Sequence, residues 1–187
     1  MSEPAIERIL FTEAQIEERI REVAAEISAK YAGRELKLIG VLKGSVFFLT
    51  SLARELTVNV KVDFLAVSSF ANQRGAPGMV RLAKDLDESI EGEDVMLVED
   101  IVDTGFTTRY LLQHLAARAP SSLAICTLLD RTSRRIVQVP IDYRCFEIPD
   151  RFVVGYGLDY KQLYRNLKYV AVLNPEPGPE WANGEAT

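Results

Sequence analysis

The chain has 187 residues, 48% hydrophobic and 26% charged, with a formal net charge of −5 at pH 7. This composition is typical of one globular domain spanning residues 1–187. The start lacks the basic and apolar stretches of a signal peptide, and no apolar run approaches the ~18 residues that cross a bilayer. We therefore expect a cytoplasmic protein without a membrane partner. The longest basic run is the pair Arg134 and Arg135, which argues against nucleic acid as a partner.

The first predicted element is a long helix that begins after Thr12. Thr12 and Gln15 have the spacing of a capping box, and Gly33 can end the helix. Its apolar stripe has helical spacing and consists of Ile16, Ile20, Val23, Ile27 and Tyr31. A buried strand at 36–42 and a helix at 45–56 are predicted to follow.

Strands and helices continue to alternate through the middle of the chain. The predicted elements are a strand at 58–70, a mobile loop at 71–78, a strand at 94–100, a helix at 107–119 and a strand at 122–130. This alternation predicts an α/β fold, with a largely parallel twisted sheet covered by helices on both faces. The two cysteines, Cys126 and Cys145, lie in apolar segments and are expected to be buried reduced thiols.

The last third of the chain differs from the rest. From Arg131 onward it is richer in strand and turn signals, which predicts a small hood lobe. The Pro- and Gly-rich tail at 174–187 is expected to be flexible, so that the folded core covers about residues 10–173.

Acidic side chains follow the strand at 94–100, at the sheet edge where ligands gather in open parallel sheets. Glu99 and Asp100 close this strand, and Asp103 comes three residues later. The next turn and helix start offer backbone N–H groups and the hydroxyls of Thr104, Thr107 and Thr108, which suit a phosphate. Carboxylates accept hydrogen bonds from paired sugar hydroxyls and can hold Mg²⁺. The pattern fits a ribose 5-phosphate.

Two other interpretations compete for this stretch. A Walker-type triphosphate site is excluded, because no lysine follows the glycine as in a P-loop. Taken alone, the acids also fit solvated side chains at a strand end, with Asp103 or Thr104 as a simple N-cap.

The full string VEDIVDTGFTT, residues 98–108, resembles the phosphoribosyl pyrophosphate (PRPP) binding motif of type I phosphoribosyltransferases. The match with the hypoxanthine-guanine phosphoribosyltransferases extends over about residues 10–173. It includes the strings VLKGS, SSF, LLDR, FEIPDRFVVGYGLDY and YRNL. The resemblance implies Mg²⁺-dependent transfer of the 5-phosphoribosyl group from PRPP to hypoxanthine or guanine, giving IMP or GMP and pyrophosphate in purine salvage. It also implies a homodimer or homotetramer.

The resemblance implies roles for residues around PRPP. Glu99 and Asp100 would accept the ribose hydroxyls, directly or through Mg²⁺, and Asp103 would handle the proton of the incoming purine. The 5-phosphate would be held by Thr104, Gly105, Phe106, Thr107 and Thr108. Pyrophosphate would be held by Lys43, Gly44 and Arg165, with a cis bond expected before Lys43. Asp159 would hold a second Mg²⁺.

The resemblance also assigns residues to the purine and to a lid. Purine contacts would come from Arg131, Phe152, Val153 and Asp159, and the lid would include Ser69 and Phe70. Relatives usually carry a lysine at the position of Arg131 and often a tyrosine at that of Phe70. His114, the only histidine, is interpreted as structural.

Two other functions remain as alternatives. Some proteins of this fold are nucleotide-sensing regulators that bind RNA or DNA, but they need a basic surface that this acidic chain does not offer. A pyrimidine phosphoribosyltransferase would leave FVVGYGLDY unexplained. The preference among hypoxanthine, guanine and xanthine does not follow from the sequence.

Overall fold

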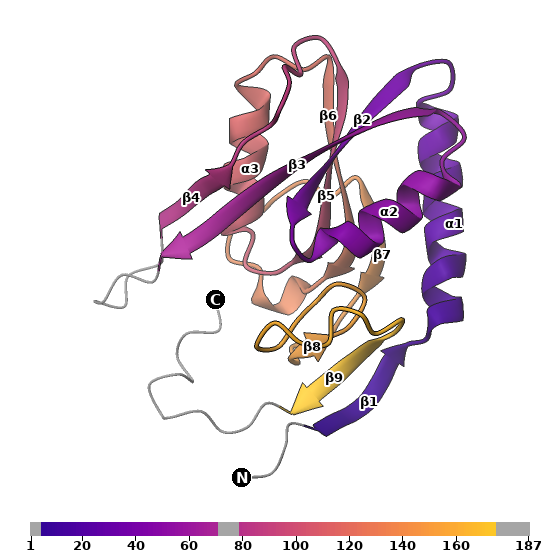
Figure 1. Cartoon of the computed structure of the whole chain (residues 1–187), viewed down its shortest axis with the longest axis vertical. Helices are drawn as coiled ribbons and strands as arrows, with labels where there is room; N and C mark the ends of the chain where they lie inside the picture. Colours follow the sequence, from indigo (N-terminus) through magenta and orange to yellow (C-terminus); the bar gives the residue numbers. More distant parts are fainter. Residues whose placement is uncertain (1–4, 71–78, 175–187) are drawn as a thin grey trace.

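The computed structural model describes residues 5–70 and 79–174 of the chain. The loop predicted at 71–78 and the tail predicted beyond residue 174 lie outside these residues. Figure 1 shows the elements in chain order. They are β1 (Ala5–Phe11), α1 (Glu13–Lys30), β2 (Glu35–Leu42), α2 (Ser45–Glu55), β3 (Asn59–Phe70), β4 (Met79–Lys84), β5 (Asp94–Val102), α3 (Phe106–Ala116), β6 (Ser122–Asp130), the 3-10 turn η1 (Thr132–Arg134), β7 (Tyr143–Glu147), β8 (Val153–Val154) and β9 (Val170–Asn174).

The larger sheet has the strand order β4-β3-β2-β5-β6-β7. All neighbouring pairs from β3 to β7 are parallel, while β4 is antiparallel to β3 at the edge. The largely parallel α/β sheet expected from the sequence is therefore confirmed. Strand β4 was not predicted, because it follows a Gly- and Pro-rich stretch and is fixed by pairing with β3 rather than by a pattern of its own.

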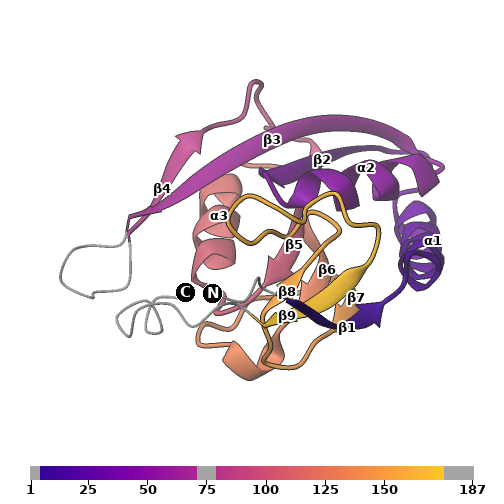
Figure 2. The same ribbon diagram turned by 60° about the horizontal axis from the view of Figure 1, so that its bottom comes forward.

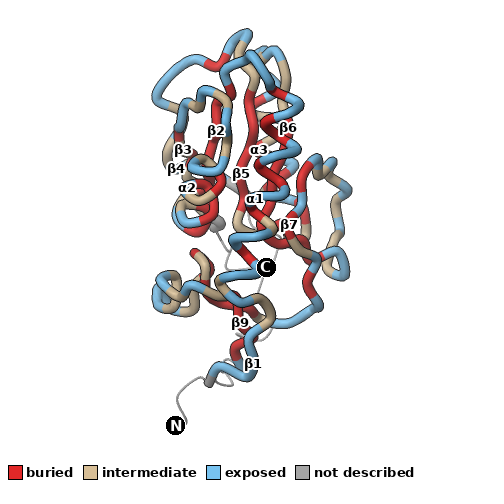
Figure 3. The backbone as a smooth tube through the Cα atoms, turned by 90° about the vertical axis from the view of Figure 1, so that its right-hand side faces the viewer, coloured by how far each residue is buried: buried red, intermediate tan, exposed pale blue. Residues whose placement is uncertain are grey.

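Helices cover both faces of this sheet, with α1 and α2 on one side and α3 on the other (Figures 1 and 2). The predicted capping box of Thr12 and Gln15 is present at the start of α1. The apolar stripe of α1 is buried with Leu36 and Leu38 of β2, whereas Leu111 of α3 packs with residues of the opposite face. Figure 3 shows the resulting buried centre of the sheet.

A second sheet, the hood, has the order β1-β9-β8 and is antiparallel throughout. It lies beyond the carboxyl ends of the parallel strands (Figures 1 and 2). The small lobe predicted from the last third of the chain is present, with β8 and β9 in it, but the structure differs from the prediction in two respects. The N-terminal strand β1 supplies one edge of the hood, and β7 belongs to the larger sheet. Phe11 of β1 stacks on Phe146 of β7 at 4.0 Å between ring centroids, which joins the two sheets.

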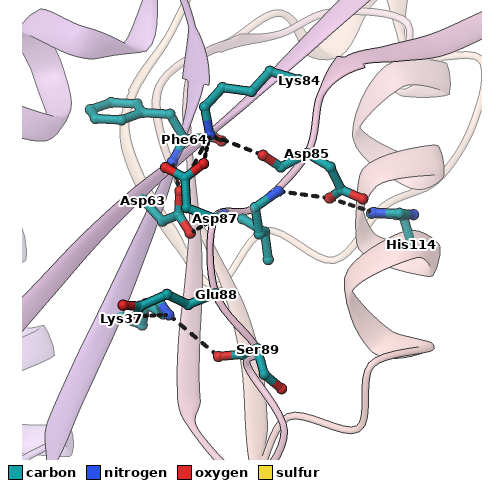
Figure 4. A network of polar contacts seen from close by, with 10 residues as sticks. Lys37, Asp63, Phe64, Lys84, Asp85, Asp87, Glu88, Ser89 and His114 are labelled. Carbon is teal, nitrogen blue, oxygen red and sulfur yellow. Dashed lines mark hydrogen bonds and ion pairs between the residues drawn. The ribbon is translucent and has the colours of Figure 1, made fainter.

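The connection from β4 to β5 is tied to the fold by polar contacts (Figure 4). Asp63 Oδ2 on β3 accepts a hydrogen bond from the N–H of Asp87 at 3.0 Å. His114 Nε2, near the end of α3, lies 3.1 Å from Asp85 Oδ1. His114 thus lies near the opposite end of α3 from the acidic turn. None of the helices in the described part of the chain has both the length and the hydrophobicity that a membrane span requires.

Candidate active site

The acidic pair lies within β5 rather than closing it. The strand continues to Val102, pairing with β6 along its length. Glu99 is only 4% exposed, and its Oε1 accepts a hydrogen bond from the Thr108 hydroxyl at 3.5 Å. Burial, reinforced by the neighbouring charge of Asp100, holds the pKa of the Glu99 carboxyl well above its usual range. The alternative of a solvated strand-end acid is therefore wrong for Glu99.

Asp100 connects the acidic pair to the hood. Burial raises the pKa of its carboxyl to about 6, although the Ile101 N–H donates to Oδ1 at 2.9 Å. The guanidinium of Arg165 opposes this pKa shift, and the carboxylate of Asp159 adds to it. Arg165 and Asp159, some sixty positions away in the sequence, therefore act electrostatically on this half-buried acid.

The turn after β2 packs directly against Asp100. The Leu42–Lys43 peptide bond is cis, as the family resemblance implied. A Cβ added at Gly44 would lie 1.6 Å from Asp100 Oδ2, and a Cβ added at Gly157 would lie 2.0 Å from the Gly44 carbonyl oxygen. No side chain fits at either glycine, because three chain segments meet here.

The residues predicted to hold pyrophosphate and a second metal ion come together at this junction. Arg165 Nη1 donates to the Gly157 carbonyl at 2.7 Å, and its Nη2 lies 2.6 Å from Asp159 Oδ1. The turn at Lys43 and Gly44 lies on the other side of Gly157. The junction thus brings Arg165, Asp159 and the backbone of the turn at Lys43 and Gly44 next to Asp100, and such a mixture of cation and carboxylates suits a metal-bound polyphosphate.

The turn between β5 and α3 presents a helix N-terminus. Gly105 has φ +90°, in the left-handed region, and is the N-cap of α3, and no side chain of the described residues caps the first N–H groups. The alternative in which Asp103 or Thr104 is a simple N-cap is therefore wrong. Uncapped N–H groups at a helix start favour an anion. Phe106 is 44% exposed, and Thr107 and Thr108 follow it in the first turn of α3.

Two buried polar atoms beside this turn have no hydrogen-bond partner within the described residues, Asp103 Oδ1 and Arg131 Nε. Arg131, 7% exposed, donates from Nη1 to Asp103 Oδ2 at 3.2 Å and from Nη2 to the Arg151 carbonyl at 2.8 Å. One acceptor and one donor therefore lie on two side chains that are already bonded to each other. Buried groups of this kind usually have a partner, so the pair points to a ligand.

The predicted aromatic platform adjoins Arg131. Phe152 directly follows Arg151, whose carbonyl Arg131 contacts. The ring of Phe152 meets that of Tyr160 edge-on, with centroids 5.7 Å apart. Val153 is 4% exposed and begins β8, so the hood sheet positions this part of the site.

The predicted lid residues end β3. Ser69 pairs with Val80 and Phe70 with Met79 in the antiparallel β3–β4 ladder. The segment between these strands lies outside the described residues, so the lid expectation stays a prediction.

The acids of the site suit Mg²⁺. No three His, Cys, Asp or Glu side chains converge within the described residues. Mg²⁺ is usually bound by one or two carboxylates together with water and substrate phosphates. Asp100 and Asp159 offer hard oxygen donors near each other, and the charge of Asp159 adds to the rise that burial causes in the pKa of Asp100. The residues present therefore fit the ion.

The chain matches a known protein family over most of its length. A family model described as a phosphoribosyl transferase domain matches residues 9–161. The chain belongs to the phosphoribosyltransferase family. It is accordingly an enzyme of the transferase class.

Named phosphoribosyltransferases are similar over nearly the whole chain. The hypoxanthine-guanine phosphoribosyltransferase of Mycobacterium avium is 46% identical over 176 residues, covering 91% of this chain and 87% of that protein. The hypoxanthine phosphoribosyltransferase of Escherichia coli K12 is 46% identical over 164 residues, covering 87% and 92%. The solved hypoxanthine phosphoribosyltransferase of Trypanosoma cruzi, in complex with the product IMP, is 44% identical with a TM-score of 0.85, covering 92% and 97%.

Two residues that pack at the candidate site, Gly157 and Arg135, were not predicted from the sequence. Gly157 separates Gly44 from Arg165, and Arg135 lies behind the turn that carries Asp103. The sequence shows Arg135 only as half of the longest basic run, with nothing to indicate burial. Its carbonyl partners are defined only once β5 and the segment after β6 lie side by side.

Proposed function

We propose that this phosphoribosyltransferase transfers the 5-phosphoribosyl group from PRPP to hypoxanthine or guanine, giving IMP or GMP and pyrophosphate in the cytoplasm. The observation that carries the proposal is the unpaired donor and acceptor on Arg131 and Asp103. A 6-oxopurine presents an exocyclic oxygen, which accepts, beside a ring N–H, which donates. That edge is complementary to Arg131 Nε and Asp103 Oδ1.

The names of the relatives support the same substrates. The proteins of M. avium and E. coli are named for hypoxanthine or for hypoxanthine and guanine, and the T. cruzi structure contains the product IMP. Identity above 40% over most of the chain makes a shared substrate class the best-supported proposal.

Departure of pyrophosphate from C1 of PRPP develops negative charge on the leaving group and positive charge on the ribose. Lys43 and Arg165 are the cations proposed to stabilise the leaving group. Mg²⁺, held by Asp159 and by Glu99 and Asp100 with the ribose hydroxyls, would neutralise phosphate charge. The uncapped N–H groups after Gly105 would hold the 5-phosphate.

The purine must lose the proton of the ring N–H beside its exocyclic oxygen as another of its ring nitrogens attacks C1 of PRPP. Asp103 Oδ1 is proposed to accept that proton, while Oδ2 stays bonded to Arg131. Phe152 is proposed to stack on the base, and the backbone of Val153 and Asp159 to read its remaining edge. A lid that includes Ser69 and Phe70 would exclude water, which would otherwise hydrolyse PRPP.

The test is incubation with PRPP, Mg²⁺ and each nucleobase in turn, with pyrophosphate release as the measurement. Hypoxanthine or guanine should release pyrophosphate. Adenine should react at least about a hundredfold less efficiently, because its 6-amino group would face the Arg131 donor and leave it unsatisfied. Omission of Mg²⁺ should abolish release.

The same assay separates the alternatives. Comparable turnover of adenine would contradict the role given to Arg131. Turnover of orotate or uracil alone would replace the purine assignment with a pyrimidine phosphoribosyltransferase. Nucleotide binding without any turnover would favour a regulator.

A further inference from the structure

The segment that follows η1 packs against the turn that carries Asp103 and binds the backbone of that turn. The Arg135 side chain is 8% exposed. Its Nε donates to the Asp103 carbonyl at 2.8 Å, and its Nη2 donates to the Val102 carbonyl at 3.2 Å. The same Nη2 is paired with the carboxylate of Asp130, whose side chain is 4% exposed. One buried guanidinium therefore fixes two consecutive peptides at the end of β5.

The two residues after Arg135 hold the next peptide of the same turn. The N–H groups of Ile136 and Val137 donate to the Thr104 carbonyl at 3.0 and 2.9 Å. Gly105 packs so closely on this segment that an added Cβ would lie 2.3 Å from the Val137 carbonyl oxygen. Three successive carbonyls of the turn are thus bound by residues 135–137.

We propose that Arg135 is the positioning residue of the phosphate-binding turn. It holds the backbone of Asp103 to Gly105 in the conformation in which the following N–H groups converge on the 5-phosphate of PRPP or of the nucleotide product. This inference rests on the proposed function and deepens it. Arg135 acts through the backbone of the turn, and its planar fork of donors is what allows one side chain to bind three acceptors.

The surrounding charges make the assignment testable without loss of the fold. Asp130 also pairs with Arg144 Nη1 at 3.0 Å, so its buried carboxylate keeps a cation when Arg135 is replaced. Arg144 contacts Asp130 but no carbonyl of the turn among the hydrogen bonds of the described residues. Arg144→Gln is therefore a matched control, which removes an arginine from the same carboxylate and leaves the turn alone.

The experiment compares two ligands at opposite ends of the site. Binding of IMP and of Mg²⁺-pyrophosphate is measured by calorimetry for the unmodified enzyme, Arg135→Gln and Arg144→Gln. Arg135→Gln should weaken IMP binding by about tenfold or more, since small misplacements of a binding group are costly. Pyrophosphate binding should change less than about twofold, because Lys43 and Arg165 do not depend on this turn, and Arg144→Gln should change neither.

Two further measurements complete the comparison. Thermal melts establish that each variant is folded. If Arg135→Gln does not fold, Arg135→Lys takes its place, because it keeps a charge beside Asp130 but has a single nitrogen for three acceptors. If the variant at Arg135 lost the same affinity for both ligands, or bound IMP as tightly as the unmodified enzyme, the assignment would be overturned. An unmodified enzyme that binds neither ligand would instead refute the proposed function.

Discussion

At the scale of single residues, the site depends on carboxylates in three different environments. Glu99 is buried in the sheet, Asp100 lies between the sheet and the hood, and Asp103 bonds Arg131 beside an uncapped helix start. The sequence places all three within five positions, whereas the fold separates their roles. Each environment leads to a different experiment.

Asp103→Asn should slow turnover by about 10²–10⁴-fold, the range typical of a lost general base. PRPP affinity should change little, because the backbone of the turn is held by residues 135–137 rather than by the Asp103 side chain. Single-turnover rates and PRPP titration of one preparation provide the measurement. An Asn variant with full activity would remove Asp103 from proton transfer.

The Asp100 carboxyl predicts a pH dependence of stability. Its pKa is raised from 3.8 to about 6, so the folded state favours the neutral form. Between these two values the unfolded chain binds fewer protons, and the free energy of unfolding should fall as the pH rises. Metal-free Asp100→Asn should melt about 2–4 °C higher than the unmodified protein at pH 8, and show little difference at pH 4. Thermal melts with chelator at both pH values measure this.

Glu99 and Asp100 together are expected to determine the affinity for PRPP. The double variant Glu99→Ala with Asp100→Ala should lose most of its PRPP affinity while remaining folded, because removal of the two adjacent carboxyl groups relieves the cost of desolvating them beside each other. A loss of stability with PRPP binding intact would mean that the acids serve the fold instead.

At the scale of elements, the turn after β2 is the most constrained part of the site. Gly44→Ala would place a methyl group 1.6 Å from Asp100 Oδ2, so either the turn or the acid must move. We expect a fall in kcat/KM for PRPP of about a hundredfold or more, from misplacement of the pyrophosphate-binding backbone. Gly92→Ala is a useful control, since no atom of the described residues beyond its chain neighbours lies within 4 Å of its added Cβ, although φ +71° strains it locally. Steady-state kinetics of both variants decide whether the effect is specific to the site.

At the scale of the whole molecule, the hood shares a buried cluster with the larger sheet, in which Val170 of β9 and Leu129 of β6 both lie. Phe11 stacks on Phe146 across this junction. Phe11→Ala should lower the unfolding free energy by about 1–3 kcal/mol, from lost apolar burial and the ring pair. It should also raise the KM for the base more than that for PRPP, because Phe152 and Val153 belong to the hood and the phosphate-binding turn does not. Denaturant melts and steady-state kinetics test both parts, and Phe11→Leu, which keeps apolar volume, should be milder in both.

Assembly also belongs to this scale. The homodimer or homotetramer implied by family resemblance stays a prediction, and sedimentation or light scattering measures it directly.

The sequence by itself determined the local elements and the contiguous part of the site. The capping box of Thr12 and Gln15, the apolar stripe of α1 and the apolar runs of β2, β5 and β6 are short-range patterns, so they are readable without a fold. The string at 98–108 is likewise contiguous, and it identified the acidic pair and the turn that begins α3.

Only the tertiary structure decided which distant segments complete the site. Nothing local to β1 shows that it pairs with β9 from the other end of the chain. Nor does sequence spacing show that Arg131 bonds Asp103, or that Arg165 lies near Asp100. The physical reason is that periodicity reports which face of an element is apolar, whereas these contacts depend on how separate elements pack. Arg135 is the clearest case, a charged side chain that is buried because its partners are backbone carbonyls of another strand end.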